Sequence, residues 1–156
     1  MKKLKTVLKV LAVLLVVTFA VIQFFGIDKR GPATVQADTL GAAVTVPANV
    51  NAILERSCND CHTNSTVYPW YSNVQPFGWF LQNHINDGRR HLNLSQFGTY
   101  ASNRKVKKLD EVCEQVQSRE MPLPSYLWIH RDSVLSDADI KVLCDWSNEV
   151  KSKISE

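Results

Sequence analysis

The stretch Cys58-Asn59-Asp60-Cys61-His62 decides how the rest of the 156-residue chain is arranged. Two cysteines separated by two residues, with a histidine directly after the second, form the attachment signature of a c-type haem. Each thiol adds to one vinyl group of the same porphyrin, so one tight turn must present both sulfur atoms to one ring. The histidine can then bind the iron from one side of the ring. The motif predicts one covalently attached haem c, with Cys58 and Cys61 as attachment sites and His62 as an iron ligand.

Two other interpretations of the motif were weighed. The cysteines could form a dithiol redox pair, with His62 lowering a thiol pKa. They could also supply part of a zinc site, but zinc usually requires a second Cys/His pair at short spacing. Cys113 and Cys144 are distant in the sequence and are not spaced as such a pair. No βαβ pattern of the thioredoxin kind surrounds the motif, which disfavours a thiol-disulfide oxidoreductase.

The N-terminal region predicts export. An apolar run from Val10 to Ile27 follows four lysines, and 18 helical residues span about 27 Å, close to the hydrocarbon thickness of a bilayer. The lysines place the N-terminus in the cytoplasm. We therefore predict a retained signal anchor over residues 1–27, a single transmembrane helix in the bacterial inner membrane. Cleavage after Val35-Gln36-Ala37 is the alternative, but signal peptidase sites normally follow the apolar run closely.

The charge of the chain does not suggest a nucleic-acid partner. Four of the 18 basic side chains precede Asp28, the first acidic residue, so the remainder of the chain has 14 basic and 15 acidic side chains. The formal net charge of +3 therefore belongs to the N-terminal segment and concerns membrane topology. We expect the exported part to face the periplasm.

The remainder of the chain divides into a linker and one helical domain. Residues 28–46 contain glycine, proline and small residues without helical spacing, and they predict a linker. Residues 47–156 predict a haem-binding domain in which apolar side chains recur at helical spacing. The predicted helices run from Pro47 to the haem motif and over residues 77–87, 104–118 and 137–152. The predicted fold is mostly α: a small cytochrome c-like domain with four or five helices around one haem.

Local signals mark the ends of these helices. Gly88 would close the second helix, and Asn103 would cap the third. The run Ser136-Asp137-Ala138-Asp139 is a capping box for the last helix. Cys113 and Cys144 lie on the apolar stripes of the last two helices, where a disulfide could form in an oxidising compartment. Two buried free thiols are the alternative.

Met121 is the candidate for the sixth iron ligand. Pro122 moves Met121 out of helical geometry, so the thioether lies on a loop rather than on a packed helix face. Iron held by His and Met has a raised potential, suited to electron transfer. The competing ligands are His84, His91 and His130. Arg89 and Arg90 could pair with haem propionates, or they could be solvated surface residues.

Taken in order, these motifs resemble the bacterial haem-binding domain family, small membrane-anchored or periplasmic proteins similar to c-type cytochromes. The resemblance covers roughly residues 46–150. It rests on the haem motif followed by Tyr68-Pro69-Trp70-Tyr71, His84, Gly88-Arg89, Leu92-Asn93-Leu94-Ser95, Glu120-Met121-Pro122-Leu123, Tyr126, His130 and Leu143-Cys144-Asp145-Trp146. The resemblance implies haem attachment at Cys58 and Cys61, His62 as the proximal ligand and Met121 as the distal one.

The predicted function is single-electron transfer by a membrane-tethered mono-haem cytochrome c, an electron carrier rather than an enzyme. Its partners would be other redox proteins and the membrane. If Met121 does not bind the iron, an open sixth position would instead allow a sensor of small ligands or a peroxidase-like enzyme, with His84, His91 or Arg89 as distal polar groups. A third possibility is an accessory subunit of a larger respiratory complex.

Overall fold

The computed structural model describes residues 2–155, and helices dominate this part of the chain, without any strand. The mostly α fold predicted from the sequence is confirmed. The elements in order are α1 (Lys2–Ile22), η1 (Gln36–Asp38), α2 (Leu40–Ala43), α3 (Ala48–Ser57), α4 (Asn59–His62), η2 (Trp70–Asn73), α5 (Phe77–His91), η3 (Phe97–Thr99), α6 (Ser102–Gln117), α7 (Pro124–Leu127), η4 (Arg131–Ser133) and α8 (Asp137–Ser155).

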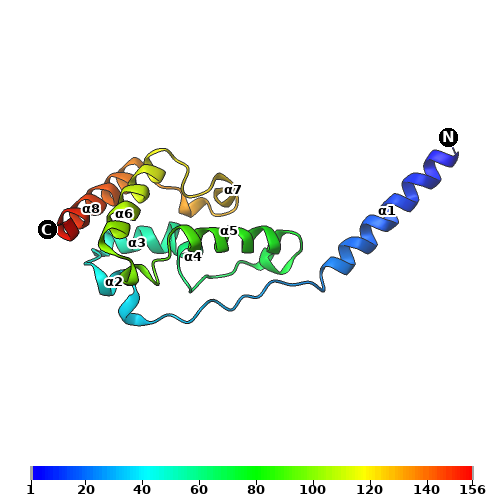
Figure 1. The fold of residues 1–156 in the computed structure, drawn as a ribbon. Helices are drawn as coiled ribbons and strands as arrows, with labels where there is room; N and C mark the ends of the chain where they lie inside the picture. The colour runs from blue at the N-terminus through cyan, green and yellow to red at the C-terminus, as the bar shows by residue number, and fades with distance from the viewer. Residues whose placement is uncertain (1, 156) are drawn as a thin grey trace.

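Helix α1 stands apart from the helical domain (Figure 1). None of its residues is buried, and its length and apolar composition would allow it to cross a membrane. A signal sequence near the N-terminus has the same properties. The helix ends at Ile22, whereas the apolar run continues to Ile27. Phe24 and Phe25 therefore lie outside the helix and are exposed.

The core of the domain lies where α3, α6 and α8 pack together. The predicted apolar stripes are the buried ones, because side chains three or four residues apart share one face of a helix. They contribute Val50, Ile53 and Leu54 from α3, Leu109 and Val116 from α6, and Ile140, Leu143 and Cys144 from α8. Phe97 and Tyr100, which follow α5, complete this core with tilted ring contacts at 5.7 Å.

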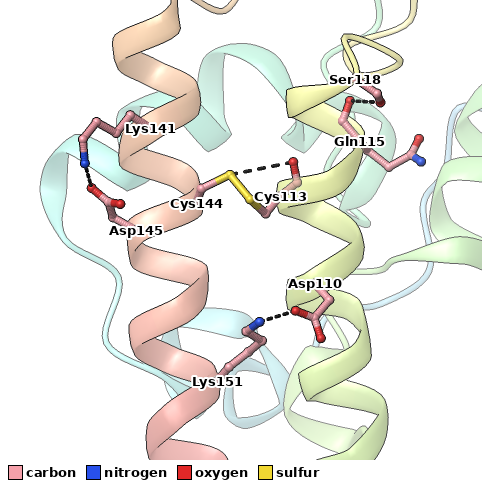
Figure 2. The surroundings of a disulfide bond; sticks show 8 residues. All are labelled: Asp110, Cys113, Gln115, Ser118, Lys141, Cys144, Asp145 and Lys151. Atoms are coloured by element: carbon pink, nitrogen blue, oxygen red, sulfur yellow. Dashed lines mark hydrogen bonds and ion pairs between the residues drawn. A yellow bond between two sulfur atoms is a disulfide. The ribbon is translucent and has the colours of Figure 1, made fainter.

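A disulfide joins α6 to α8 (Figure 2). Cys113 and Cys144 are the two cysteines singled out in the sequence as a possible pair, and their Cα atoms are 4.8 Å apart. Lys151 on α8 also forms an ion pair with Asp110 on α6, and this pair lies farther along the same interface. The two longest helices of the domain are therefore joined covalently and electrostatically.

The predicted end of the second helix at Gly88 is wrong. Helix α5 continues to His91, and Leu92 is its C-cap. Gly88 lies inside α5, at the point where α4 approaches this helix closely. A Cβ atom at this position would be 2.7 Å from the backbone oxygen of Cys61, so the approach requires glycine. The glycine thus allows two helices to touch and does not serve as a turn residue.

The helix caps were predicted with mixed success. Helix α6 begins at Ser102 with Ala101 as its N-cap, so the prediction of Asn103 as the cap is wrong. The capping box before α8 is confirmed, because Ser136 Oγ accepts from Asp139 N at 3.1 Å. In return, Asp139 Oδ2 accepts from Ser136 N at 2.9 Å.

The predicted linker contains folded elements. Thr39 caps α2 by accepting a hydrogen bond from Ala42 N, and Leu40 is buried in the core. Leu40 N also donates to Leu94 O at 2.8 Å. The proposed boundaries at residues 28–46 and 47–156 stay a prediction, to which the structure adds that α2 packs with the helical domain.

Candidate haem-attachment site

Both cysteines of the haem motif lie on one helical turn. Helix α3 ends at Ser57, and Cys58 departs from helical geometry with φ −127° and ψ −41°. A new turn begins at once, because Cys58 O accepts from Cys61 N at 3.2 Å and from His62 N at 3.0 Å. Cys58 is thus the N-cap of the turn that carries Cys61, and attachment of both sulfur atoms to one haem stays a prediction.

His62 is oriented by a backbone carbonyl. Its Nδ1 lies 2.9 Å from Leu92 O, which can only accept a hydrogen bond, so Nδ1 donates the proton. The Nε2 atom then has the free lone pair, as in histidines that bind metals. Burial lowers the pKa of His62, while hydrogen bonds to the Leu92 and Gly88 carbonyls oppose that shift. The imidazole is therefore held neutral, which is the form that binds iron.

The thiols of the motif are free and protonated at neutral pH. Cys58 and Cys61 form no disulfide. Burial raises the pKa of Cys58 to about 12, with a further contribution from Cys61. Burial and the nearby Asp60 raise the pKa of Cys61 to about 11. Redox-active cysteines have lowered pKa values, and the pKa values of Cys58 and Cys61 are shifted in the opposite direction.

Asp60, between the two cysteines, connects the motif to two other parts of the domain. Its Oδ1 accepts from Val67 N at 3.1 Å, and its Oδ2 accepts from the Tyr126 hydroxyl at 3.1 Å. Thr66 Oγ1 donates to its backbone oxygen at 2.6 Å. Burial raises the pKa of Tyr126, and the Asp60 carboxylate raises it further, so the phenol keeps its proton and donates it to Asp60.

Arg89 holds the chain that follows the motif. Its Nε donates to Thr63 O at 2.7 Å, and its NH2 group donates to Thr66 Oγ1 at 2.9 Å. The guanidinium therefore fixes the loop between α4 and η2. Arg90, which was considered with it as a propionate partner, is exposed and forms an ion pair with Asp87.

A buried polar network fixes the other side of the motif. Asn64 Oδ1 accepts from Asn93 Nδ2 at 2.9 Å, and Asn64 N donates to Ser95 Oγ at 3.0 Å. Asn93 N donates to the Tyr100 hydroxyl at 3.0 Å. Leu94 N donates to the His62 backbone oxygen at 2.7 Å. Residues 92–95 thus hold both the backbone and the imidazole of His62.

Met121 lies on the loop between α6 and α7, as predicted. It is half-buried, and its backbone nitrogen donates to Gln115 O at 3.1 Å. The same loop leads into α7, where Tyr126 contacts Asp60 of the motif. The structure therefore brings the segment after Met121 to the haem motif, while ligation of iron by Met121 stays a prediction.

The three competing histidines have different surroundings. His130 lies near the motif: its Nε2 forms a 2.9 Å hydrogen bond with the Tyr71 hydroxyl, and its ring stacks on Tyr126 at 4.1 Å. His84 Nδ1 lies 2.8 Å from Phe80 O, one turn back on α5. His91, at the end of α5, is exposed. His130 is therefore joined to Tyr71 and Tyr126 by a hydrogen bond and by stacking, while His91 lies near enough to His62 to lower its pKa.

The donor set fits a haem better than a bare metal ion. Among residues 2–155, no group of three or more His, Cys, Asp or Glu side chains is placed to hold an ion. A zinc site needs such a group, whereas a porphyrin brings its own four nitrogen atoms and needs only axial ligands and attachment points. Two thiols on one turn and a neutral, oriented imidazole supply these.

These features define a small helical haem-binding protein. Residues 17–149 match the model of the family described as a haem-binding domain, and the chain belongs to that family. The resemblance noted in the sequence is thereby confirmed. No curated protein and no solved structure matches the chain.

The sequence identified the haem motif but not the residues whose hydrogen bonds hold it in place. Asp60, Arg89, Asn64 and Asn93 form contacts with residues distant in the sequence, and a local pattern cannot predict such partners. A partial signal was present, because Gly88-Arg89 and Leu92-Asn93-Leu94-Ser95 were among the motifs of the resemblance. The polar residues of these segments are the ones that hold the haem motif in place.

Proposed function

We propose that this protein is a membrane-tethered mono-haem c-type cytochrome that transfers single electrons on the periplasmic side of the inner membrane. Cys58 and Cys61 would hold the haem through thioether bonds, and His62 and Met121 would be the axial ligands. The helix α1 would remain as the tether. The partners would be other redox proteins, and the chain would act as an electron carrier rather than an enzyme.

The main supporting observation is the geometry of His62. The Nδ1 atom of His62 donates its proton to Leu92 O. Cys61, directly before His62, is a free cysteine on the same turn as Cys58. When bound, the haem would supply a reversible one-electron change at its iron. The protein would supply the rest: Leu92 O orients the imidazole, and burial favours its neutral form.

The first experiment is an optical spectrum in both oxidation states, with protein produced alongside cytochrome c maturation machinery. We expect a low-spin six-coordinate haem with a weak sulfur-to-iron charge-transfer band and no reaction with carbon monoxide. The haem should survive denaturing electrophoresis. The Cys58→Ser/Cys61→Ser variant should lose it, while Cys113→Ser/Cys144→Ser should retain it. A chain without covalent haem would reject the proposal.

The role of Met121 requires its own variant. Loss of a thioether ligand lowers the potential of a haem iron, so Met121→Ala should lower the reduction potential and open the sixth position to carbon monoxide. His84→Ala is the matched control and should change neither property. An unchanged potential in Met121→Ala would remove Met121 from the ligand set.

One observation favours the alternative function, a sensor of small ligands or a peroxidase-like enzyme. The phenols of Tyr71 and Tyr126 and the imidazole of His130 form a polar cluster joined to the motif through Asp60. Such groups could hydrogen-bond to a ligand at an open sixth position. A high-spin haem that binds carbon monoxide rapidly would favour this function over electron transfer.

A further inference from the structure

The chain that leaves α1 does not hang free but is attached to the start of α5. Gln23 and Gln75 exchange two hydrogen bonds: Gln23 Nε2 donates to Gln75 O at 3.1 Å, and Gln75 N donates to Gln23 Oε1 at 2.9 Å. Gln75 is almost fully buried. Trp79 Nε1 donates to Phe25 O at 2.8 Å. These contacts begin one residue after α1 ends.

The attachment continues along the same edge of the domain (Figure 1). Lys29 donates a hydrogen bond to the Asn73 side chain and lies over the Tyr68 ring at 5.7 Å. Asn64 Nδ2 donates to Ala33 O at 3.2 Å, and Gly31 packs directly against Asn64 O, where a Cβ atom would not fit. Residues 23–33 therefore follow the domain closely instead of acting as a flexible spacer.

Large apolar side chains are exposed in the segments that carry these contacts. Trp70 is 76% exposed, Phe77 59% and Phe24 89%. In the sequence, each lies within three residues of Gln23, Asn73 or Gln75, which form the contacts described above. We define the junction surface as Phe24, Phe25, Trp70, Phe77, Trp79 and Phe80. Isolated exposed apolar residues are ordinary, but a group of this size on a small domain marks an interaction site.

We infer that the junction surface lies in the interface of the same bilayer that α1 crosses, so that the domain rests on the membrane with η2 and the start of α5 against it. This inference rests on the proposed retention of α1, and it does not depend on the haem chemistry. Three features of the chain lead to it, beginning with continuity: Phe24 and Phe25 follow closely after α1, and Phe25 O accepts a hydrogen bond from Trp79 of α5.

The second feature is the length of α1. Only its part from Val10 to Ile22 is free of lysine, and 13 helical residues span about 20 Å, less than the roughly 30 Å of a bilayer core. The apolar side chains just outside the helix therefore complete the span and lie at the outer edge of the bilayer core. Aromatic residues are enriched at that level in membrane proteins.

The third feature is the charge of the surface. Arg30 forms an ion pair with Asp28, and Lys29 donates a hydrogen bond to the neutral Asn73 side chain, so both basic groups have partners on this chain. The surface itself offers aromatic rings, beside a Lys29 charge that the Asn73 amide does not neutralise. It fits the interfacial region of a zwitterionic bilayer, and it does not require anionic lipids.

Quenching of tryptophan fluorescence by brominated lipid tests the inference. The full chain with its haem is reconstituted into vesicles of dioleoylphosphatidylcholine or of the same lipid brominated at the double bond. Quenching by the haem is the same in both lipids and cancels in their ratio. We expect the brominated lipid to lower the fluorescence of the unaltered protein and of Trp146→Phe, whose indole is buried in the core. In Trp70→Phe/Trp79→Phe this bromine-dependent loss should fall by more than half.

A second variant keeps all four tryptophans. Phe77→Ser/Phe80→Ser removes two rings of the junction surface, and we expect a smaller bromine-dependent loss than in the unaltered protein. Equal losses in Trp70→Phe/Trp79→Phe and Trp146→Phe, or no loss in the unaltered protein, would overturn the inference. So would a purified chain whose mass shows that α1 has been removed.

An optical spectrum of the same vesicles separates this result from the proposed function. A c-type haem spectrum without bromine-dependent quenching overturns the junction surface alone. Quenching that depends on Trp70 and Trp79 in a chain without covalent haem supports the junction surface and rejects the cytochrome proposal.

Discussion

Asn93 is a buried residue whose side chain completes the support of the haem motif. Its Nδ2 donates to Asn64 Oδ1, and its Oδ1 accepts from Ser95 N at 3.0 Å. Asn93→Ala would leave both of these buried groups without a partner, so we expect the free energy of unfolding to fall by about 1–3 kcal/mol. Urea denaturation followed by circular dichroism measures the change. Asn148→Ala, at an exposed position on α8, should change it by less than about 0.5 kcal/mol, and equal effects would contradict the role of the network.

At the level of residues, the sequence predicted what is local in the site. Cys58, Cys61 and His62 lie close together in the sequence, and their spacing alone predicts attachment of a haem. The partner of His62 could not be predicted, because Leu92 O is a backbone atom that any residue type would supply. Likewise, the hydrogen bond between Tyr126 and Asp60 joins side chains 66 positions apart. Such pairs depend on the fold as a whole.

The contact between α4 and α5 depends on Gly88. An alanine in a helix is favoured over glycine by about 1 kcal/mol, but a Cβ atom at this position would meet the backbone of Cys61, which cannot move without disturbing the motif. We expect Gly88→Ala to lower the free energy of unfolding by about 1–3 kcal/mol. Thermal unfolding and the yield of covalent haem measure the effect.

Gly41→Ala is the matched control for that substitution. Gly41 is also helical, in α2, and a Cβ atom there would have nothing within 4 Å. It should be neutral or stabilising by up to about 1 kcal/mol. If both alanine variants were stabilising, the close approach of α4 to α5 would be incorrect.

The capping box of α8 should make stability depend on pH in acid. Hydrogen bonds from the backbone and side chain of Ser136 lower the pKa of Asp139 below its ordinary value of 3.8, and Arg56 contributes less. The ionised carboxylate therefore stabilises the fold above pH 3.8, and this stabilisation is lost as the pH falls through the lowered pKa. Asp139→Asn should reduce stability at pH 7 and flatten the acid part of the curve.

Denaturant midpoints between pH 7 and pH 2 measure this dependence. Asp145→Asn, which removes an exposed carboxylate that pairs with Lys141 on the same helix, should have little effect on stability. A curve for Asp139→Asn that stays parallel to that of the unaltered protein would show that the box does not supply the acid sensitivity.

At the level of elements, apolar spacing predicted the existence of the long helices better than their ends. Val50, Ile53 and Leu54 are buried as their spacing requires. The end of α5 was misjudged because glycine has two uses, as a turn residue and as a point of close approach, and only the neighbouring α4 distinguishes them. Leu40 and α2 were missed because a single buried leucine in a four-residue helix has no periodicity.

At the level of the whole molecule, a disulfide links α6 to α8, two helices that pack against each other in the core (Figure 2). The disulfide closes a loop with a sequence separation of 31 residues, and a loop of that length corresponds to about 3–4 kcal/mol of stabilisation in the chain-entropy model. Cys113→Ala/Cys144→Ala should lower the urea midpoint accordingly. The unaltered protein should become equally unstable in dithiothreitol, while the variant should not respond to it. A midpoint unchanged by both treatments would contradict the prediction.

The global arrangement could be predicted only in outline. Composition and spacing indicated one apolar N-terminal helix and one small helical domain, and the structure has both. The path between them was not predictable, because the contacts of Gln23 with Gln75 and of Gly31 with Asn64 join segments that are featureless by themselves.

The hydrogen bonds between Gln23 and Gln75 also set how this protein would meet other molecules. A haem on a long flexible tether can sample a hemisphere of solvent and can reach soluble proteins at many distances from the membrane surface. With α1 in a bilayer, the two bonds would leave only lateral diffusion and rotation about the membrane normal. Collisions would then occur in two dimensions, and their frequency would depend on the number of partner molecules per unit of membrane area rather than on their bulk concentration.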